Sequence, residues 1–505
     1  MKIFYADQIK AWDRYTIKHE PTASIDLMER AAQAFVKQLL HLYPEQRFLI
    51  FCGSGNNGGD GLAIARLLYH QHVEVEVWLL KDKILSADAQ VNYDRLMQTG
   101  CSFKTITKDI LVTEPEWLRI NAQPFVLIDA LLGTGLNRKA DGIYAEFIHR
   151  MNATQKKIVS VDIPSGLFAD TPMDEGQVIV RASETITFQL PKRSFFYVDN
   201  QSVLGNWFVV DIHLSEAYKN QTVTGIHFTQ WKQIQDIYKP RFPFAHKGNF
   251  GKALLLAGSY GMMGAAVLAA KACLRSGVGL LKVYTPSCGL NILQTTVPEA
   301  MVSTDPSETE FSAVPDLSAY QAIGIGPGWS ESDQALEFLT SILAVSTVPL
   351  VIDAGALNVL SKAPDMFGSI PKGSILTPHK KEFDRLVGRE LSQEKQERQA
   401  MIWAKQYDVQ FILKGRHSAV ILSDGTIHYN STGNAGMAKG GSGDCLTGIV
   451  LALLAQGYTS QQAAVMGAFM HGYAGDEAAK EYGQEAMLPS DLIDSIGAFF
   501  KAVRF

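Results

Sequence analysis

Short apolar runs that end in glycine turns alternate along the chain with longer stretches of helical periodicity. This alternation predicts strand, turn and helix in repetition, and hence parallel sheets covered by helices on both faces. In the first half the predicted strands are 47–52, 73–80, 125–128 and 158–161. In the second half they include 253–257, 280–284, 322–325, 350–352 and 409–413.

A polar and aromatic stretch, 214–248, separates the two series of strands. It contains Lys239-Pro240-Arg241-Phe242-Pro243, which interrupts regular structure. A chain of 505 residues is also too long for one ordinary core. We therefore predict two α/β domains, residues 1–224 and 225–505.

The composition narrows the class of protein. Hydrophobic residues make up 47% and charged residues 19%, which is typical of a soluble globular protein. The net charge of −5 argues against nucleic acid as a partner, and no apolar run reaches membrane length. Five scattered cysteines favour free thiols in a reducing compartment. We expect a cytoplasmic protein that binds no membrane.

A glycine-rich turn in the second half is the strongest chemical signal. The run from Asn434 to Asp444 leads directly into the apolar stretch 445–455. Glycines before a helix let backbone N–H groups surround an anion, and Asp444 would accept a proton from an attacking hydroxyl. The alternative is an ordinary glycine-rich helix entry. Two further turns that follow predicted strands, Gly326-Pro327-Gly328 and Lys414-Gly415, favour a nucleotide pocket.

A second glycine-rich run, Gly53 to Gly61, follows the predicted strand 47–52 and precedes the helical run 62–69. This placement is typical of a phosphate loop. Gly53, Gly55 and Gly58 have the Gly-x-Gly-x-x-Gly spacing but not in the usual register, which disfavours a hydride-transfer enzyme.

Two other strand ends in the first half carry polar side chains, Asp129 after one strand and Asp162 and Ser165 after another. The carboxyl ends of parallel strands share one sheet edge, so these residues and Asn57 are expected to converge. Hard oxygen groups of this kind suit an alkali or alkaline-earth ion. The alternative is that Asp129 and Asp162 only cap the following turns.

These motifs resemble two known families. Gly-Ser-Gly-Asn-Asn-Gly-Gly-Asp-Gly, with the later Asp-Ala-Leu-Leu-Gly-Thr-Gly and Asp-Ile-Pro-Ser-Gly, is similar to the NAD(P)HX epimerase family, or YjeF N-terminal domain. The second half resembles the ADP-dependent NAD(P)HX dehydratases of the ribokinase-like superfamily through His246-Lys247-Gly248, Gly258-Ser259, Gly326-Pro327-Gly328, Thr377-Pro378-His379 and the turn before Asp444. The resemblance implies a Rossmann-like three-layer α/β/α domain followed by a ribokinase-like α/β/α domain.

The resemblance also implies an activity, the repair of nicotinamide cofactors that have gained water. The first half would interconvert the R and S forms of NADHX and NADPHX. The second half would dehydrate the S form with ADP as co-substrate and Mg²⁺ bridging its phosphates. Potassium is implied for the epimerase site, and we expect a homo-oligomer.

The site residues implied by the resemblance fall into sets. Hydrate phosphates and ribose in the first half are expected at Asn56, Asn57, Gly58, Gly59 and Asp60, and at Gly133, Thr134, Gly135, Leu136, Asn137, Arg138 and Lys139. Asp162 is expected beside the reacting ring as acid or base, and Asn57, Asp129 and Ser165 as potassium ligands. In the second half the hydrate is expected at Ala265, Gly328, His379 and Asp444, and the nucleotide at Lys414, Gly415, Arg416, His417, Ser418 and Gly443.

The second half departs from the family pattern at two places. Lys380-Lys381-Glu382 stands where Pro-Gly-Glu is usual, and Ser418 stands where threonine is usual. The altered turn leaves open that His379 is a structural histidine, and His246, His417 and His471 are themselves expected to be structural.

Two other functions compete with cofactor repair. A small-molecule kinase for a sugar or vitamin precursor would use the same glycine turn and Asp444, because fold does not determine substrate. The first half would then be a binding module without catalysis. Asp162, together with the set of oxygen-bearing residues at the strand ends, favours catalysis.

Overall fold

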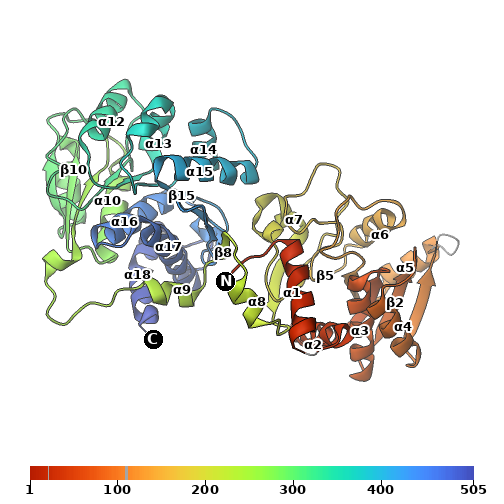
Figure 1. Cartoon of the computed structure of the whole chain (residues 1–505). Helices are drawn as coiled ribbons and strands as arrows, with labels where there is room; N and C mark the ends of the chain where they lie inside the picture. Colours follow the sequence, from red (N-terminus) through yellow and green to blue (C-terminus); the bar gives the residue numbers. More distant parts are fainter. Residues whose placement is uncertain (21, 108–111, 505) are drawn as a thin grey trace. The chain divides into compact units, whose positions relative to one another are not determined.

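The chain is described by a computed structural model that covers residues 1–20, 22–107 and 112–504. It forms two compact units, Lys2–Thr224 and Gly225–Phe505, and Met1 joins the second through its amino group, which donates to the carbonyl of Phe228 at 2.7 Å. Figure 1 shows a sheet covered by helices in each unit. The five cysteines carry free thiols. In the described ranges no helix is both long and apolar enough to cross a membrane.

The first unit contains a seven-stranded sheet in the order β3-β2-β1-β4-β5-β6-β7, and every neighbouring pair is parallel. Its strands are β1 (Arg47–Cys52), β2 (Val75–Leu80), β3 (Ser102–Ile106), β4 (Phe125–Ala130), β5 (Ile158–Val161), β6 (Glu184–Phe188) and β7 (Asn206–Val210). Its helices are α1 (Ala6–His19), α2 (Ser24–Leu42), α3 (Asn56–His70), α4 (Ala87–Met97), α5 (Glu114–Ala122), α6 (Gly142–Ala153), α7 (Gln201–Leu204) and α8 (Glu216–Gln221).

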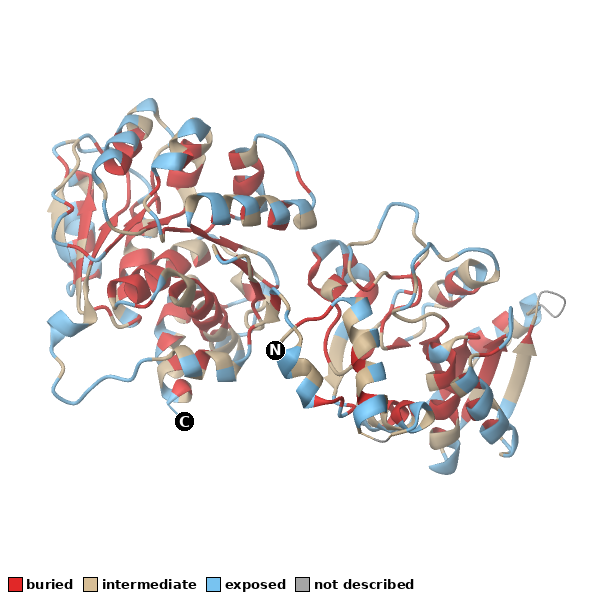
Figure 2. Cartoon of the chain, viewed as in Figure 1, coloured by how far each residue is buried: buried red, intermediate tan, exposed pale blue. Residues whose placement is uncertain are grey.

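Both faces of this sheet are buried, because successive side chains along a strand point to opposite faces. On β1, Phe48 and Ile50 pack into one hydrophobic cluster with residues of α2 and α3. Leu49 and Phe51 pack into another with residues of α5 and α6. The central strands are therefore apolar at almost every position, and Figure 2 shows them as buried.

The second unit contains a ten-stranded sheet in the order β11-β10-β9-β12-β13-β14-β15-β16-β17-β8. Its strands are β8 (Ile226–Phe228), β9 (Lys252–Leu256), β10 (Leu280–Thr285), β11 (Met301–Thr304), β12 (Ala322–Ile325), β13 (Leu350–Ile352), β14 (Ile375–Leu376), β15 (Gln410–Leu413), β16 (Ala419–Ile421) and β17 (Ile427–Tyr429). Its helices are α9 (Trp231–Ile237), α10 (Met263–Arg275), α11 (Leu290–Thr296), α12 (Asp333–Val345), α13 (Ala354–Ser361), α14 (Lys380–Val387), α15 (Gln393–Tyr407), α16 (Ser442–Ala455), α17 (Ser460–Tyr482) and α18 (Pro489–Val503).

The expectation of purely parallel sheets is wrong for this unit. β16 runs antiparallel to both β15 and β17, while the other neighbouring pairs are parallel. The connections 414–418 and 422–426 are too short for the crossover that parallel strands need, so each forms a hairpin. The predicted strand bounds otherwise agree with the structure to within two residues.

Two further expectations need correction. The glycine run of the first unit is not a loop throughout, because α3 already begins at Asn56 rather than at residue 62. Glycine is needed at this position of the helix because there is no room for a side chain. A Cβ on Gly58 would lie 1.8 Å from the carbonyl oxygen of Gly53. The stretch 214–248 is not uniformly irregular either, since it contains α8, β8 and α9.

Candidate functional sites

The glycine turn of the second unit ends in the first turn of α16. Gly441 precedes the helix with φ +97°, a backbone conformation that favours glycine, and a Cβ there would lie 2.6 Å from Leu268 Cδ1. No side chain caps this helix start, so its first N–H groups face outward with the positive end of the helix dipole. The carbonyl of Ser442 is held by Nε2 of His471 at 2.9 Å. Asp444 is the third residue of the helix, beside an anion-binding terminus.

An ion pair lies next to this helix start. Asp353 follows β13 and is 1% exposed. Its Oδ1 accepts a hydrogen bond from Lys414 Nζ at 2.6 Å, and its Oδ2 accepts one from Thr447 Oγ1 of α16 at 2.8 Å. A Cβ on Gly443 would lie 3.0 Å from Lys414 Nζ, so the glycine keeps room for the lysine. The sequence analysis identified Lys414 and Gly443 but missed Asp353 and Thr447, which carry no motif of their own.

The surroundings of Asp444 bring the pKa of its carboxyl group close to neutral pH. Burial is the main cause, and the charges of Asp353 and Glu382 add to it, while Lys414 opposes them; together they raise the pKa of Asp444 from 3.8 to about 7. A carboxylate with a pKa close to ambient pH is suited to act as a general base.

His379 immediately precedes α14 and caps its start. Its Nδ1 accepts a hydrogen bond from the N–H of Glu382 at 3.2 Å, and Glu382 Oε2 accepts one from the N–H of His379 at 2.8 Å. This reciprocal capping is the structural role that the sequence left open for His379. Burial and the charge of Lys414 lower the pKa of His379. Lys380 points to Asp384 of the same helix at 2.8 Å, so this substitution adds a local ion pair.

Two other expected hydrate contacts lie together at neighbouring strand ends. A Cβ on Gly328 would be 3.3 Å from the Cβ of Ala265, and the φ of Gly328 is +70°. Ser259 Oγ donates to the carbonyl of Gly328 at 2.7 Å and ties the turn after β12 to the turn after β9. This brings residues from distant parts of the sequence to one edge of the sheet.

The turn from Lys414 to Ser418 joins β15 and β16. Arg416 donates to the carbonyl of Gly433 at 2.5 Å. His417 is buried with Nδ1 3.0 Å from the carbonyl of Asn430, and burial lowers its pKa to about 4. His417 is therefore neutral and holds the turn, while Gly415 has open space around its α carbon.

In the first unit, the structure brings Asn57, Asp129 and Ser165 together around Leu132. Asn57 Nδ2 donates to the carbonyl of Leu132 at 3.1 Å, and the N–H of Leu132 donates to Ser165 Oγ at 2.8 Å. Ser165 Oγ lies 2.5 Å from Asp129 Oδ1. Asp129 is fully buried, and the N–H groups of Leu131 and Ser165 and the hydroxyl of Ser160 also donate to it. Asp129 thus does cap its turn, as the alternative interpretation held.

Asn56 to Asp60 form the first turn of α3, and no side chain caps this helix start. The neighbouring loop from Gly133 to Lys139 is mostly exposed, and the side chains of Asn137, Arg138 and Lys139 are at the surface. Lys139 donates to the carbonyl of Glu175 at 2.7 Å. The two segments share a contact, since a Cβ on Gly133 would lie 3.1 Å from the Cβ of Asn57.

Asp162 is held on the other side, toward β6. Its backbone has φ +66°, and its Oδ1 accepts a hydrogen bond from Lys192 Nζ at 2.6 Å. Burial and the charge of Asp162 raise the pKa of Asp13, on α1, to about 6, and the same causes raise the pKa of Asp60 well above its usual value. Asp13 and Lys192 were not predicted from the sequence. Lys192 lies between β6 and β7, and neither strand was predicted, so no local signal pointed to it.

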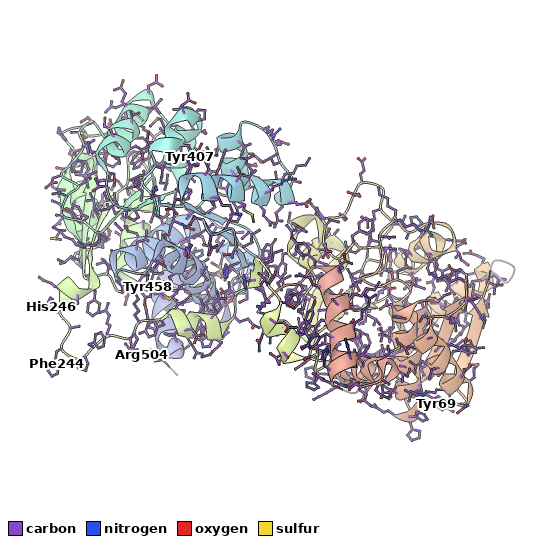
Figure 3. The ribbon with its side chains drawn as sticks, in the orientation of Figure 1. Tyr69, Phe244, His246, Tyr407, Tyr458 and Arg504 are labelled. Atoms are coloured by element: carbon purple, nitrogen blue, oxygen red, sulfur yellow. The ribbon has the colours of Figure 1, made fainter. Side chains whose placement is uncertain are left out.

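A separate cavity of about 880 Å³ in the second unit is lined by Tyr458 and Arg504, labelled in Figure 3, and by the segment 238–250. Two cations of this cavity, Arg241 and Lys239, bind carbonyl groups at helix ends. Arg241 donates to the carbonyl of Gly277 after α10, and Lys239 donates to that of Gly457 after α16 at 2.9 Å. Basic side chains are common at such carbonyl-rich ends.

Fold and sites define a two-unit α/β enzyme with an uncapped, glycine-bordered helix start beside carboxylates in each unit. The model of the YjeF-related protein N-terminus matches residues 24–194, and the model of NAD(P)H-hydrate dehydratase matches residues 253–497. The chain belongs to the family of bifunctional NAD(P)H-hydrate repair enzymes.

The relatives that show this are similar over almost their whole length. The bifunctional NAD(P)H-hydrate repair enzyme Nnr of Moorella thermoacetica is 34% identical, over 98% of this chain and 96% of the relative. That of Escherichia coli is 33% identical, over 98% and 93%. Among solved structures, an ADP/ATP-dependent NAD(P)H-hydrate dehydratase from Bacillus subtilis co-crystallised with ATP and Mg²⁺ is 30% identical, with a TM-score of 0.49, and covers 56% of this chain and 100% of that chain.

Proposed function

We propose that the second unit dehydrates S-NAD(P)HX with ADP and that the first unit interconverts the R and S hydrates. The observation that carries the proposal is Asp444, a carboxylate with a pKa of about 7 in the first turn of an uncapped helix, beside Lys414. A base, an anion-binding terminus and a cation are the parts that phosphoryl transfer needs. Relatives named as bifunctional NAD(P)H-hydrate repair enzymes support the assignment.

In the second unit the reaction begins with a poor leaving group, the ring hydroxyl of the hydrate. Asp444 takes the hydroxyl proton as the oxygen attacks the β-phosphorus of ADP, and AMP leaves. The C–O bond of the new ring phosphate then breaks, inorganic phosphate departs and a ring proton is lost, which regenerates the reduced nicotinamide. The net change is hydrate plus ADP to NAD(P)H, AMP and phosphate. The N–H groups at the start of α16 stabilise the transferring phosphoryl group.

Residues of the second unit take their proposed places around this reaction. Ala265, Gly328 and His379 contact the hydrate; Gly443 and the turn from Lys414 to Ser418 contact the nucleotide. Mg²⁺ bound with the nucleotide neutralises phosphate charge. The nucleotide phosphates are its proposed ligands.

In the first unit the phosphates of the hydrate bind at the uncapped start of α3 and along the loop from Gly133 to Lys139. Asp162 acts as acid or base at the hydrated ring. The potassium ion is assigned to Asn57, Asp129 and Ser165, whose side chains meet around Leu132. Amide, carboxylate and hydroxyl groups supply the oxygen donors that such an ion takes. We also propose a homo-oligomer, which light scattering would measure.

A small-molecule kinase joined to a binding module is the second candidate, because Asp444 and its helix start would serve a kinase equally well. The first unit argues against it. A binding module has no need of Asp162 clamped by a buried lysine beside two further carboxyls.

One experiment separates these functions. Purified R and S hydrates are incubated with the full chain and ADP or ATP, and absorbance at the reduced-nicotinamide band is followed. The proposal is supported when NAD(P)H is recovered from the S hydrate at once and from the R hydrate only after the first unit has converted R to S. Accumulation of a stable phosphorylated product instead identifies a kinase.

A further inference from the structure

Lys192 is an unusual side chain in the first unit. It is 1% exposed, and lysine is almost never buried without a charged partner. Its Nζ donates to Asp162 Oδ1 at 2.6 Å and lies 3.0 Å from Thr187 Oγ1. The carbonyls of Phe188 and Leu190 lie 3.3 Å away. The ammonium group is therefore surrounded by oxygen atoms and fixed in position.

The same neighbourhood clamps Asp162 through one oxygen only. Besides Lys192, the N–H of Phe188 donates to Oδ1 at 2.9 Å and Thr187 Oγ1 lies 3.1 Å away. Among described residues, none donates a hydrogen bond to Oδ2. The side chain of Asp162 is 15% exposed, whereas that of its lysine partner is 1% exposed. One carboxylate oxygen is thus anchored to the protein and the other is left for a ligand.

The backbone adds a second constraint. Asp162 has φ +66°, a left-handed conformation that costs free energy for a residue with a side chain. Its N–H donates to the carbonyl of Ile186 at 2.8 Å, so β6 holds both the backbone and the side chain. An ordinary turn cap would not need a buried ammonium as well.

We infer that Lys192 is a positioning residue of the first site: it anchors Oδ1 of Asp162 and directs Oδ2 toward the hydrate. The inference rests on the proposed epimerase function. It goes further because it names the group through which Asp162 is oriented.

Other acidic side chains lie near Asp162, and Lys192 opposes their charge. Asp13 comes from α1 and Asp60 from α3, and Asp88 of α4 acts on Asp60 in turn. Burial and the charge of Asp162 raise the pKa of both Asp13 and Asp60, so these two hold protons more readily than ordinary carboxyls. Lys192 is the cation that opposes this cluster, since its charge lowers the pKa of Asp13.

The test is R/S exchange in the full chain, with kcat and KM measured separately. Lys192→Met removes the charge and keeps the length of the side chain. We expect kcat to fall about 10²-fold with little change in KM, because the hydrate phosphates bind elsewhere in the site while Oδ2 of Asp162 is no longer held in position. Lys192→Arg should restore part of the rate.

Two controls keep the outcome interpretable. Lys219→Met removes a lysine paired with Glu216 at the surface of the same unit, and exchange should be unchanged. Dehydration of S hydrate with ADP, which takes place in the second unit, reports the amount of enzyme in each sample, and circular dichroism with urea unfolding reports whether the first unit is folded.

Should Lys192→Met fail to fold, Thr187→Val provides the second test, since valine keeps the buried shape and removes only the hydroxyl beside Oδ1. It should lower exchange about 3- to 10-fold with S dehydration intact. A raised KM with unchanged kcat in Lys192→Met, or exchange left unchanged in either variant, overturns the inference. A wild-type chain that exchanges no hydrate overturns the proposed function itself, and so the two failures are distinct.

Discussion

Replacing Asp444 by Asn is the most direct test of the second site. Asparagine keeps the shape of the side chain and cannot accept the proton of the ring hydroxyl. The loss of a general base lowers the rate by about 10²- to 10⁴-fold. Because the pKa of Asp444 is about 7, dehydration by the wild-type chain should rise with pH up to about 7 and then level off. R/S exchange should be unaffected, since it takes place in the first unit.

The same substitution should stabilise the fold at alkaline pH. The pKa of Asp444 is raised from 3.8 to about 7 in the folded chain, so the unfolded chain releases this proton first as pH rises. The contribution of the protonated carboxyl is therefore present below about pH 4 and lost as pH rises to about 7, at about 1.4 kcal/mol per pKa unit, or up to about 4 kcal/mol. Asparagine carries no charge and does not lose this contribution. The ionised Asp444 carboxylate, which serves as the catalytic base, therefore lowers the stability of the folded chain.

The assay combines absorbance at the reduced-nicotinamide band, with S hydrate and ADP, with urea unfolding at pH 4.5 and pH 8. Asp494→Asn is the matched control, because Asp494 is 72% exposed and its ion pair with Arg275 at 3.5 Å contributes little to stability. An Asp444→Asn chain that dehydrates at the wild-type rate would refute the role of the base. A variant less stable than wild type at pH 8 would refute the argument from burial and neighbouring charge.

The remaining predictions concern the first site, the charges around Asp444 and the independence of the units. Asp162→Ala should lower R/S exchange by about 10²-fold or more with S dehydration intact, as chromatography of incubated R hydrate would show; normal equilibration would leave Asp162 as a turn cap. Asn57→Ala should weaken exchange in a way that raised potassium partly restores, whereas a wild-type response to potassium would contradict its ligand role. Asp353→Asn removes a charge that raises the pKa of Asp444, so the acid limb of dehydration should move to lower pH; a shift to higher pH would contradict this cause. A fragment beginning at Gly225 should fold alone and dehydrate S hydrate but leave R hydrate unused until the first unit is added; consumption of R by the fragment alone would show that the division of labour is wrong.

Much of the architecture could be predicted from the sequence because its causes are local. An apolar run such as 47–52 or 322–325 is bounded by glycine, and the structure places strands at those residues. Local patterns failed where neighbouring segments decide the conformation. The helix after the glycine turn begins at Ser442, three residues before the predicted apolar stretch, so Asp444 lies in its first turn. Glycines at the start of α3 are required because neighbouring atoms leave no space for a side chain, which composition does not reveal.

The chemical settings of the two carboxylates were decided by tertiary structure alone. Asp353 and Glu382 raise the pKa of Asp444 only because separate strand and helix ends of one sheet meet beside α16. Asp13 and Lys192 reach Asp162 from α1 and from beyond β6. Proton affinity depends on burial and on charges within a few ångströms, and such distances are set by packing between segments far apart along the chain. The sequence determined which residues could carry the chemistry, and the fold determined which of them hold a proton.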